Sequence, residues 1–193
     1  MNRKEKRIIY ADNAATTRLD QDAFEAMCPF LCENFGNASQ PYSFSRVPKN
    51  ALKIARETIA SCINASPEEI FFTSGGTESD NWALKGILKT NESQTVITSQ
   101  IEHHAILHTC ASIEQVGNKV IYLPVDRNGI VDTNTLQEAL VNKVALVSVM
   151  YANNEIGSLE PIHELCNIAH RNGAKFHTCL LYTSDAADEA RSV

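Results

Sequence analysis

From residue 66 onward, short apolar runs alternate with segments of helical pattern, and this alternation constrains the fold more than any other feature. The most apolar run, residues 144–151, is almost free of polar side chains, as expected of a strand covered on both faces. The other predicted strands are shorter and lie at residues 69–74, 95–99, 119–125 and 174–178. Repeated strand–helix–strand units with short connections predict an α/β fold of three layers, a mostly parallel sheet flanked by helices.

Helical segments are predicted between these strands, at residues 76–89, 104–116, 133–142 and 161–172. Thr133 is placed to cap the third of them, and Pro161 stands where the fourth begins. The first 65 residues differ, because a polar loop separates two helix candidates, 20–33 and 47–64. We therefore predict an N-terminal helical arm over residues 1–65 and a partial α/β domain over residues 66–178.

The C-terminal segment does not continue the alternating pattern. Residues 179–193 begin no further strand–helix unit, so the predicted sheet is incomplete. The string that opens at Cys179, CLLYTSDAADE, resembles translated sequencing-adapter read-through at the ends of assembled fragments. We expect native sequence to end at Thr178 and residues 179–193 to form a non-native tail.

Composition and charge exclude several classes of protein. A formal net charge of −6 argues against a nucleic-acid surface, which normally carries a basic excess. No run approaches the roughly 18 apolar residues that span a bilayer, and no secretory leader precedes Ile8. The 6 cysteines are scattered and form no CxxC pair. These features predict a cytoplasmic protein with reduced thiols.

The first chemical motif is the segment Thr73–Asn81, TSGGTESDN, between a predicted strand and a predicted helix. Glycines at 75 and 76 let the backbone turn and expose its N–H groups, and a helix N-terminus favours a phosphate. Thr77 adds a hydroxyl donor. The alternative is an ordinary glycine turn with Ser/Thr capping. Nucleotide binding is favoured less, because the motif lacks both the lysine of a Walker loop and the GxGxxG spacing.

The second motif is Ile101–Ile106, IEHHAI, which follows the strand at 95–99. His104 and His108 could share a helix face as metal ligands, but no third ligand is evident and no metal is predicted. The remaining interpretations are a solvated or capping histidine, a general acid or base, and an aromatic side chain stacked on a planar ring.

The third motif, Val149–Gly157, lies at the carboxyl end of the most apolar strand. Its polar residues are Asn153, Asn154 and Glu155, and the alternative is an Asn-rich turn closed by glycine. Ligands of parallel α/β sheets bind outside the carboxyl ends of the strands. Because all three motifs follow strands, we expect them to converge on one crevice, which suits a phosphorylated planar cofactor.

Five motifs in this order and spacing resemble the cysteine desulfurase family, which belongs to the class V aminotransferase-like, fold-type I enzymes that use pyridoxal 5'-phosphate. They are YADNAATT (10–17), FGNAS (35–39), TSGGTES (73–79), EH (102–103) and NNEIG (153–157). The resemblance covers about residues 8–178. It implies that residues 66–178 are an incomplete large domain of a fold-type I transferase.

The resemblance also implies roles for individual residues. Gly75, Gly76 and Thr77 match the segment that holds the cofactor phosphate. His103 matches the imidazole that stacks on the pyridine ring and is available for proton transfer. Asn154 matches the amide near the cofactor's phenolic oxygen and the substrate carboxylate. Cys179 stands where the family has the aspartate that pairs with the pyridine nitrogen.

The activity that the resemblance implies is conversion of L-cysteine to L-alanine, with the sulfur passed to an enzyme cysteine as a persulfide. The family's Schiff-base lysine and persulfide cysteine would both lie beyond Val193, so this chain by itself is expected to be inactive. A homodimer, and an iron–sulfur scaffold or another sulfur acceptor as partner, are implied as well. The alternatives are a selenocysteine lyase or another class V enzyme, and a phosphate- or nucleotide-binding module without covalent chemistry.

Overall fold

The computed structural model describes residues 9–13, 16–89, 92–140 and 143–180. The chain divides into two compact units, Met1–Phe72 and Thr73–Val193. The second unit contains the whole sheet. Of the predicted tail, residues 181–193 lie outside the described residues.

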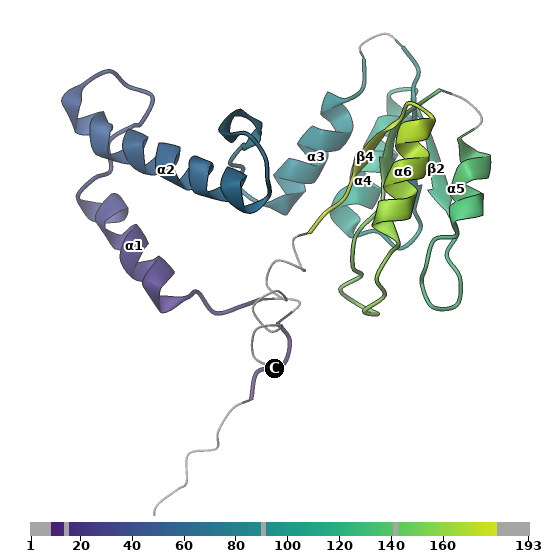
Figure 1. Ribbon diagram of the computed structural model, residues 1–193, viewed down its shortest axis with the longest axis horizontal. Coiled ribbons are helices and arrows are strands. Elements are labelled where there is room, and N and C mark those ends of the chain that lie inside the picture. The colour runs from purple at the N-terminus through teal and green to yellow at the C-terminus, as the bar shows by residue number, and fades with distance from the viewer. Residues whose placement is uncertain (1–8, 14–15, 90–91, 141–142, 181–193) are drawn as a thin grey trace, which may run out of the picture. The chain divides into compact units, whose positions relative to one another are not determined.

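The sheet of the second unit has four parallel strands in the order β2-β1-β3-β4 (Figure 1). The strands are β1 (Thr95–Ser99), β2 (Lys119–Leu123), β3 (Val144–Ser148) and β4 (Lys175–His177). In the register, Val96 lies beside Val120 on one side and Leu146 on the other. Four of the five predicted strands and the predicted parallel sheet are thereby confirmed.

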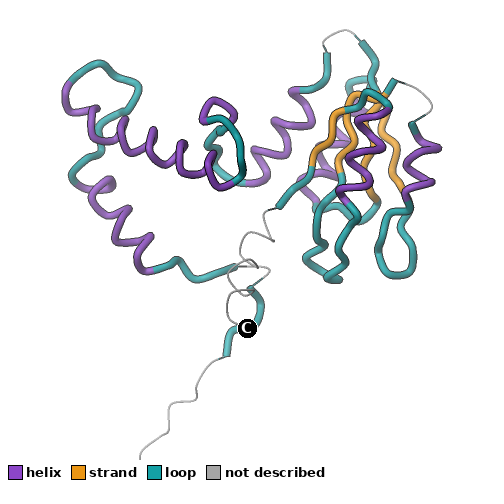
Figure 2. The backbone as a smooth tube through the Cα atoms, in the orientation of Figure 1, coloured by secondary structure: helices purple, strands orange, loops and turns teal. Residues whose placement is uncertain are grey.

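Helices cover both faces of this sheet (Figure 2). A separate apolar core lies between the sheet and each layer of helices. One core joins Ile97 and Val147 to α5 (Thr133–Ala139) and α6 (Ile162–Arg171). The other joins Val96 and Leu146 to α3 (Gly76–Gly86) and α4 (His104–Gln115). Neighbouring strand residues enter opposite cores because side chains alternate along a strand. The predicted three-layer α/β architecture is therefore confirmed.

The predicted strand at residues 69–74 is wrong. A 3-10 turn, η2 (Pro67–Glu69), opens this segment, and the side chains of Phe71 and Phe72 are 64% and 47% exposed. Instead of a strand ladder, the carbonyl of Ile70 accepts a hydrogen bond from Arg56 Nε at 3.1 Å. The Arg56 guanidinium lies 5.2 Å from the centre of the Phe72 ring. High strand propensity alone does not make this segment a strand, because no neighbouring strand pairs with it in the described part of the chain.

The N-cap of α5 also differs from the prediction. Asp132 holds the cap position in extended conformation, and its Oδ2 accepts the Thr135 N–H at 3.2 Å. Thr133 is the first helical residue instead. Aspartate and threonine both cap helices, so the sequence pattern alone did not separate the two neighbours. The predicted continuation of this helix to residue 142 includes 141–142, which lie outside the described residues.

The first unit contains the two predicted helices, α1 (Gln21–Cys32) and α2 (Arg46–Cys62), joined through the 3-10 turn η1 (Ser43–Ser45). Asp20 caps α1 by accepting the N–H groups of Asp22 and Ala23. Phe35, in the loop after α1, and Phe44, in the turn, pack edge to face with ring centres 5.2 Å apart. Within the described part of the chain, every helix is too short or too polar to cross a bilayer.

Gly129 has a left-handed backbone (φ +76°), and a Cβ there would lie 2.4 Å from the Ile156 side chain. We expect Gly129→Ala to lower the free energy of unfolding by about 1–2 kcal/mol through backbone strain, and by more if Ile156 cannot move. Gly173→Ala is the matched control, since Gly173 also has φ +76° and no atom within 4 Å of its added Cβ. Urea unfolding of both variants measures the difference. Equal losses of unfolding free energy would show that the Ile156 side chain moves aside at no cost.

Candidate functional site

The amino end of α3 forms the first part of the site. Gly75 occupies the cap position and no side chain caps the helix there, so the first-turn amides point out of the helix end without a capping acceptor from this part of the chain. The preceding turn is fixed by Glu78, whose Oε2 accepts the Ser74 N–H at 2.6 Å and its hydroxyl at 2.7 Å. These bonds lower the pKa of the Glu78 carboxyl. This geometry leaves a helix N-terminus suited to an anion.

The turn after β1 forms the second part. Glu102 is 6% exposed, and its Oε1 accepts the Ser99 hydroxyl at 2.7 Å and the Met150 N–H at 2.9 Å. It therefore links the carboxyl ends of β1 and β3. Burial raises the pKa of Glu102 to about 7. Sequence reasoning singled out the neighbouring histidine and not this carboxylate.

His103 is the N-cap of α4, and its Nδ1 accepts the Ala105 N–H at 3.1 Å. The capping interpretation of this histidine is thus correct for Nδ1. Because Nδ1 accepts a hydrogen bond, it carries no hydrogen. Any proton that His103 exchanges with a ligand therefore passes through Nε2. His104 and His108 stack on each other farther along the helix, with ring centres 5.5 Å apart. Among the described residues, no group of three potential ligands is close enough to hold a metal ion.

The loop after β3 contains two neighbouring asparagines in different surroundings. Asn153 is 7% exposed; its Nδ2 donates to the Ile101 carbonyl at 2.9 Å, and its Oδ1 accepts the N–H groups of Glu155 and Ile156. Asn154 is half-buried, and its Nδ2 donates to Glu155 Oε1 at 3.2 Å. Asn153 therefore holds the shape of the loop.

These parts meet at one small cavity at the carboxyl ends of β1, β3 and β4. It encloses about 30 Å³ and is lined by Gly76, Thr77, Asp80, Glu102, His103, Ala105, Ile106, Met150, Ala152 and Cys179. Of the predicted site residues, Gly76, Thr77 and His103 are brought together here. Gly75 and Asn154 are described residues outside this lining, each close along the chain to a residue that belongs to it.

Asp80 is a second carboxylate of the lining that sequence reasoning missed. Its side chain is 7% exposed, and its Oδ1 lies 3.6 Å from His177 Nε2. Burial raises the pKa of Asp80, while His177, His103 and a hydrogen bond from Cys179 oppose that increase. One signal could have found it: Asp80 follows Gly76 and Thr77 by four and three residues, so all three share a face of α3.

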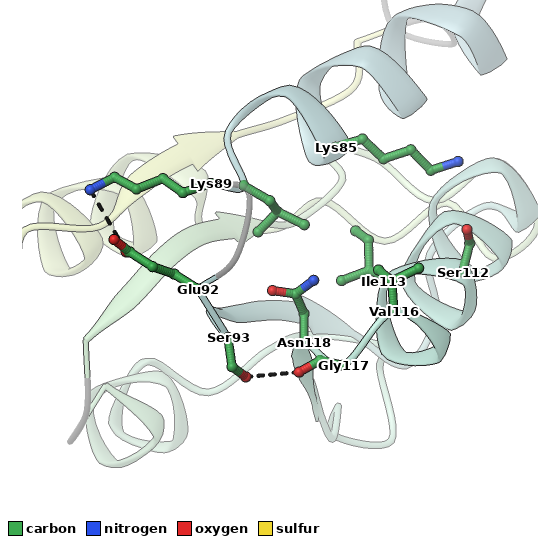
Figure 3. Close-up of a pocket in the computed structure, with 10 residues that line it drawn as sticks. Lys85, Lys89, Glu92, Ser93, Ser112, Ile113, Val116, Gly117 and Asn118 are labelled. Atoms are coloured by element: carbon green, nitrogen blue, oxygen red, sulfur yellow. Dashed lines mark hydrogen bonds and ion pairs between the residues drawn. The ribbon is translucent and has the colours of Figure 1, made fainter.

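A larger cavity of about 590 Å³ lies at the opposite end of the sheet (Figure 3). Its lining comes from the carboxyl ends of α3 and α4 and includes Lys85, Ile113 and Val116. Within it, Lys89 pairs with Glu92 at 3.8 Å, and the Ser93 hydroxyl donates to the Gly117 carbonyl. None of the predicted site residues lines this cavity.

Comparisons with known proteins agree with this geometry. The family described as "Aminotransferase class-V" matches residues 9–180. The cysteine desulfurase IscS of Methanosarcina thermophila is 48% identical over 176 residues, which are 90% of this chain and 44% of that protein. The putative cysteine desulfurase IscS 1 of Bacillus subtilis is 44% identical over 172 residues, covering 88% of this chain and 45% of the relative. The chain thus spans a little under half the length of the curated relatives it matches.

Two solved structures share the fold over nearly the whole described chain. A NifS-like protein superimposes with a TM-score of 0.83 at 37% identity, over 86% of this chain and 47% of the other. SspA in complex with cysteine superimposes with a TM-score of 0.82 at 35% identity, over 88% of this chain and 49% of the other. This chain therefore covers about half of each solved structure, as it does of the curated relatives.

Proposed function

The chain belongs to the class-V aminotransferase family, and from that premise we propose that the whole protein is a cysteine desulfurase that uses pyridoxal 5'-phosphate. One observation carries the proposal. The amino end of α3, the His103 ring and two buried carboxylates meet at one cavity, at the carboxyl ends of parallel strands. Relatives that are 48% and 49% identical to this chain over the aligned residues are named cysteine desulfurases.

The residues present fit the phosphate end of this cofactor. The uncapped first turn of α3 and the Thr77 hydroxyl supply N–H and O–H donors, and the helix dipole favours negative charge at that point. The enclosed space holds only about one or two water molecules. These residues therefore form one wall of a binding site and do not form a closed pocket.

When bound, pyridoxal phosphate supplies an electron sink for chemistry at the α-carbon of an amino acid. In this proposal Gly75, Gly76 and Thr77 hold its phosphate through backbone and hydroxyl donors. His103 would lie against the ring and would exchange a proton through Nε2, because Nδ1 accepts the Ala105 N–H. Asn154 is assigned to the substrate carboxylate. The loop that carries Asn154 is held by Asn153 beside the cavity.

The same proposal includes the wider setting of the protein. L-Cysteine is the substrate, and its sulfur passes to a cysteine of the enzyme and then to an iron–sulfur scaffold or another acceptor. We propose a homodimer in the cytoplasm. SspA, one of the structural neighbours, is described in complex with cysteine.

Removing the Thr77 hydroxyl tests the phosphate site directly. We expect Thr77→Val to weaken binding of pyridoxal phosphate to this chain by roughly tenfold or more, because a hydrogen bond to a charged group contributes about 1.5–3 kcal/mol. Binding of pyridoxal, which lacks the phosphate, is expected to change little. Titration calorimetry with both compounds measures the two effects. Thr133→Val, at the amino end of α5, is the matched control.

The chemistry is tested on the full-length protein. Release of sulfide and alanine from L-cysteine supports the desulfurase. A strong preference for L-selenocysteine would instead identify a selenocysteine lyase. If borohydride fails to trap pyridoxal phosphate on the protein, and pyridoxal binds this chain as tightly as pyridoxal phosphate, the alternative of a non-covalent binding module replaces the proposal.

A further inference from the structure

Two turns at the carboxyl end of the sheet hold each other through a pair of hydrogen bonds. From the turn after β1, Glu102 Oε1 accepts the Met150 N–H at 2.9 Å. From the loop after β3, Asn153 Nδ2 donates to the Ile101 carbonyl at 2.9 Å. Each bond therefore runs from a side chain of one turn to the main chain of the other. We call this pair of bonds the crossed link.

Further contacts hold both side chains of the crossed link in place. The Ser99 hydroxyl donates to Glu102 Oε1 at 2.7 Å, so this oxygen is also fixed from its own turn. Asn153 Nδ2 donates to Met150 Sδ at 3.4 Å as well, and its Oδ1 accepts two N–H groups of its own loop. Glu102, Met150 and Asn153 are all buried. Breaking either bond is therefore unfavourable, because the partner left behind is shielded from water.

Each side chain of the crossed link is followed directly by a residue that the proposed function assigns to the ligand. Glu102 precedes His103, and Asn153 precedes Asn154. In both pairs the first side chain is buried and the second is more exposed. The lining of the cavity includes residues of both turns. A shift of either turn would therefore move one of the two ligand residues relative to the other.

We propose that the crossed link sets the spacing between His103 and Asn154, and so prepares this side of the site for the ring of the cofactor. Glu102 and Asn153 are its positioning residues, which act on the ligand through their neighbours. This inference rests on the proposed function and deepens it. Without the crossed link, the two turns have to be ordered when the ligand binds, and that ordering costs affinity. The phosphate end of the site lies on α3, so it should not depend on this link.

The test uses the 193-residue chain and three ligands, which are pyridoxal phosphate, pyridoxal and inorganic phosphate. We expect Glu102→Leu, which removes the acceptor, to weaken binding of both ring compounds by roughly tenfold, the cost of ordering about one residue. Inorganic phosphate should bind as before. This pattern is the reverse of that for Thr77→Val, which spares pyridoxal. Titration calorimetry at pH 6 limits direct charge effects, because burial raises the pKa of Glu102 to about 7.

Three further variants separate the crossed link from general stability. Glu102→Gln keeps the oxygen that accepts the Met150 N–H, so it should retain the affinity for pyridoxal within about threefold. Asn153→Ala removes the other bond and should repeat the pattern of Glu102→Leu. Glu160→Leu is the matched control, because Glu160 is also a buried carboxylate that accepts a main-chain N–H, that of Val131, at 2.9 Å. It should lower the melting temperature without weakening pyridoxal more than phosphate.

Melting temperatures show which variants stay folded, and if one of the two removal variants unfolds, the other decides. An equal loss of affinity for pyridoxal and inorganic phosphate in the removal variants would overturn the inference and leave the proposed function intact. So would binding of pyridoxal to Glu102→Gln as weak as to Glu102→Leu, since the carboxyl would then act on the ligand directly. If the unaltered chain binds pyridoxal phosphate no better than inorganic phosphate, the proposed function fails and this inference fails with it.

Discussion

Replacing Glu102 by glutamine is expected to stabilise the chain above pH 7 by about 2–3 kcal/mol. Glu102 is 6% exposed, and burial raises the pKa of its carboxyl from 4.5 to about 7. A pKa difference of that size corresponds to about 3 kcal/mol. Glutamine keeps the Oε1 that accepts the Ser99 and Met150 hydrogen bonds and carries no charge to bury.

The sign of the pH dependence follows from the direction of the shift. Between pH 4.5 and about 7 the folded chain keeps a proton on Glu102 that the unfolded chain has released. The free energy of unfolding therefore falls as pH rises through this window. Below it, Glu102→Gln and the unaltered chain should be similarly stable. Asp80 and Glu160 add to the penalty by repelling the ionised carboxylate.

Urea unfolding at pH 4.5, 6 and 8 measures this effect. The stability difference between Glu102→Gln and the unaltered chain should be near zero at the lowest pH and largest at the highest. Glu138→Gln, on the exposed face of α5, is the matched control. A stability difference that is the same at all three values would mean that Glu102 titrates in its ordinary range.

The sequence pattern was sufficient to predict the layers of the sheet domain, because the hydrophobic periodicity agrees there with the burial of the side chains. Residues 144–148 are apolar on both faces, and both faces are in fact covered, by Leu165 on one side and Ile106 on the other. The failed strand at 69–74 has equally high strand propensity. The conformation of that segment depends on Arg56, which donates to the Ile70 carbonyl and lies over the Phe72 ring. Local composition does not reveal these two contacts.

The candidate site was visible in part for a similar reason. A glycine at the start of a helix and a histidine after a strand are local patterns, and Gly76 and His103 both line the cavity. The support of Asp80 is not local, because His177 reaches it only through the parallel pairing of β3 with β4. Long-range contacts of this kind are set by topology, so a pass along the sequence finds the helix face of Asp80 but not its partners.

The largest loss of stability from a single loop residue is expected at Asn153. Its amide makes three hydrogen bonds to the main chain, with the carbonyl of Ile101 and the N–H groups of Glu155 and Ile156. Asn153→Ala removes all three and leaves the Ile101 carbonyl without this donor. At about 1 kcal/mol for each bond, the free energy of unfolding should fall by about 3 kcal/mol.

The neighbouring residue supplies a matched control, because the Asn154 side chain is only half-buried and, within the described part of the chain, donates one hydrogen bond, to Glu155. Asn154→Ala should change stability by no more than about 0.5 kcal/mol. In the full-length protein, the proposed desulfurase activity should instead show a raised KM for the amino acid if Asn154 meets the substrate carboxylate. Chemical denaturation of the two variants, with kinetics on the second, distinguishes the residue that builds the loop from the residue that the loop presents. Equal destabilisation by both changes would contradict that division, since the loop would then depend on Asn154 as much as on Asn153.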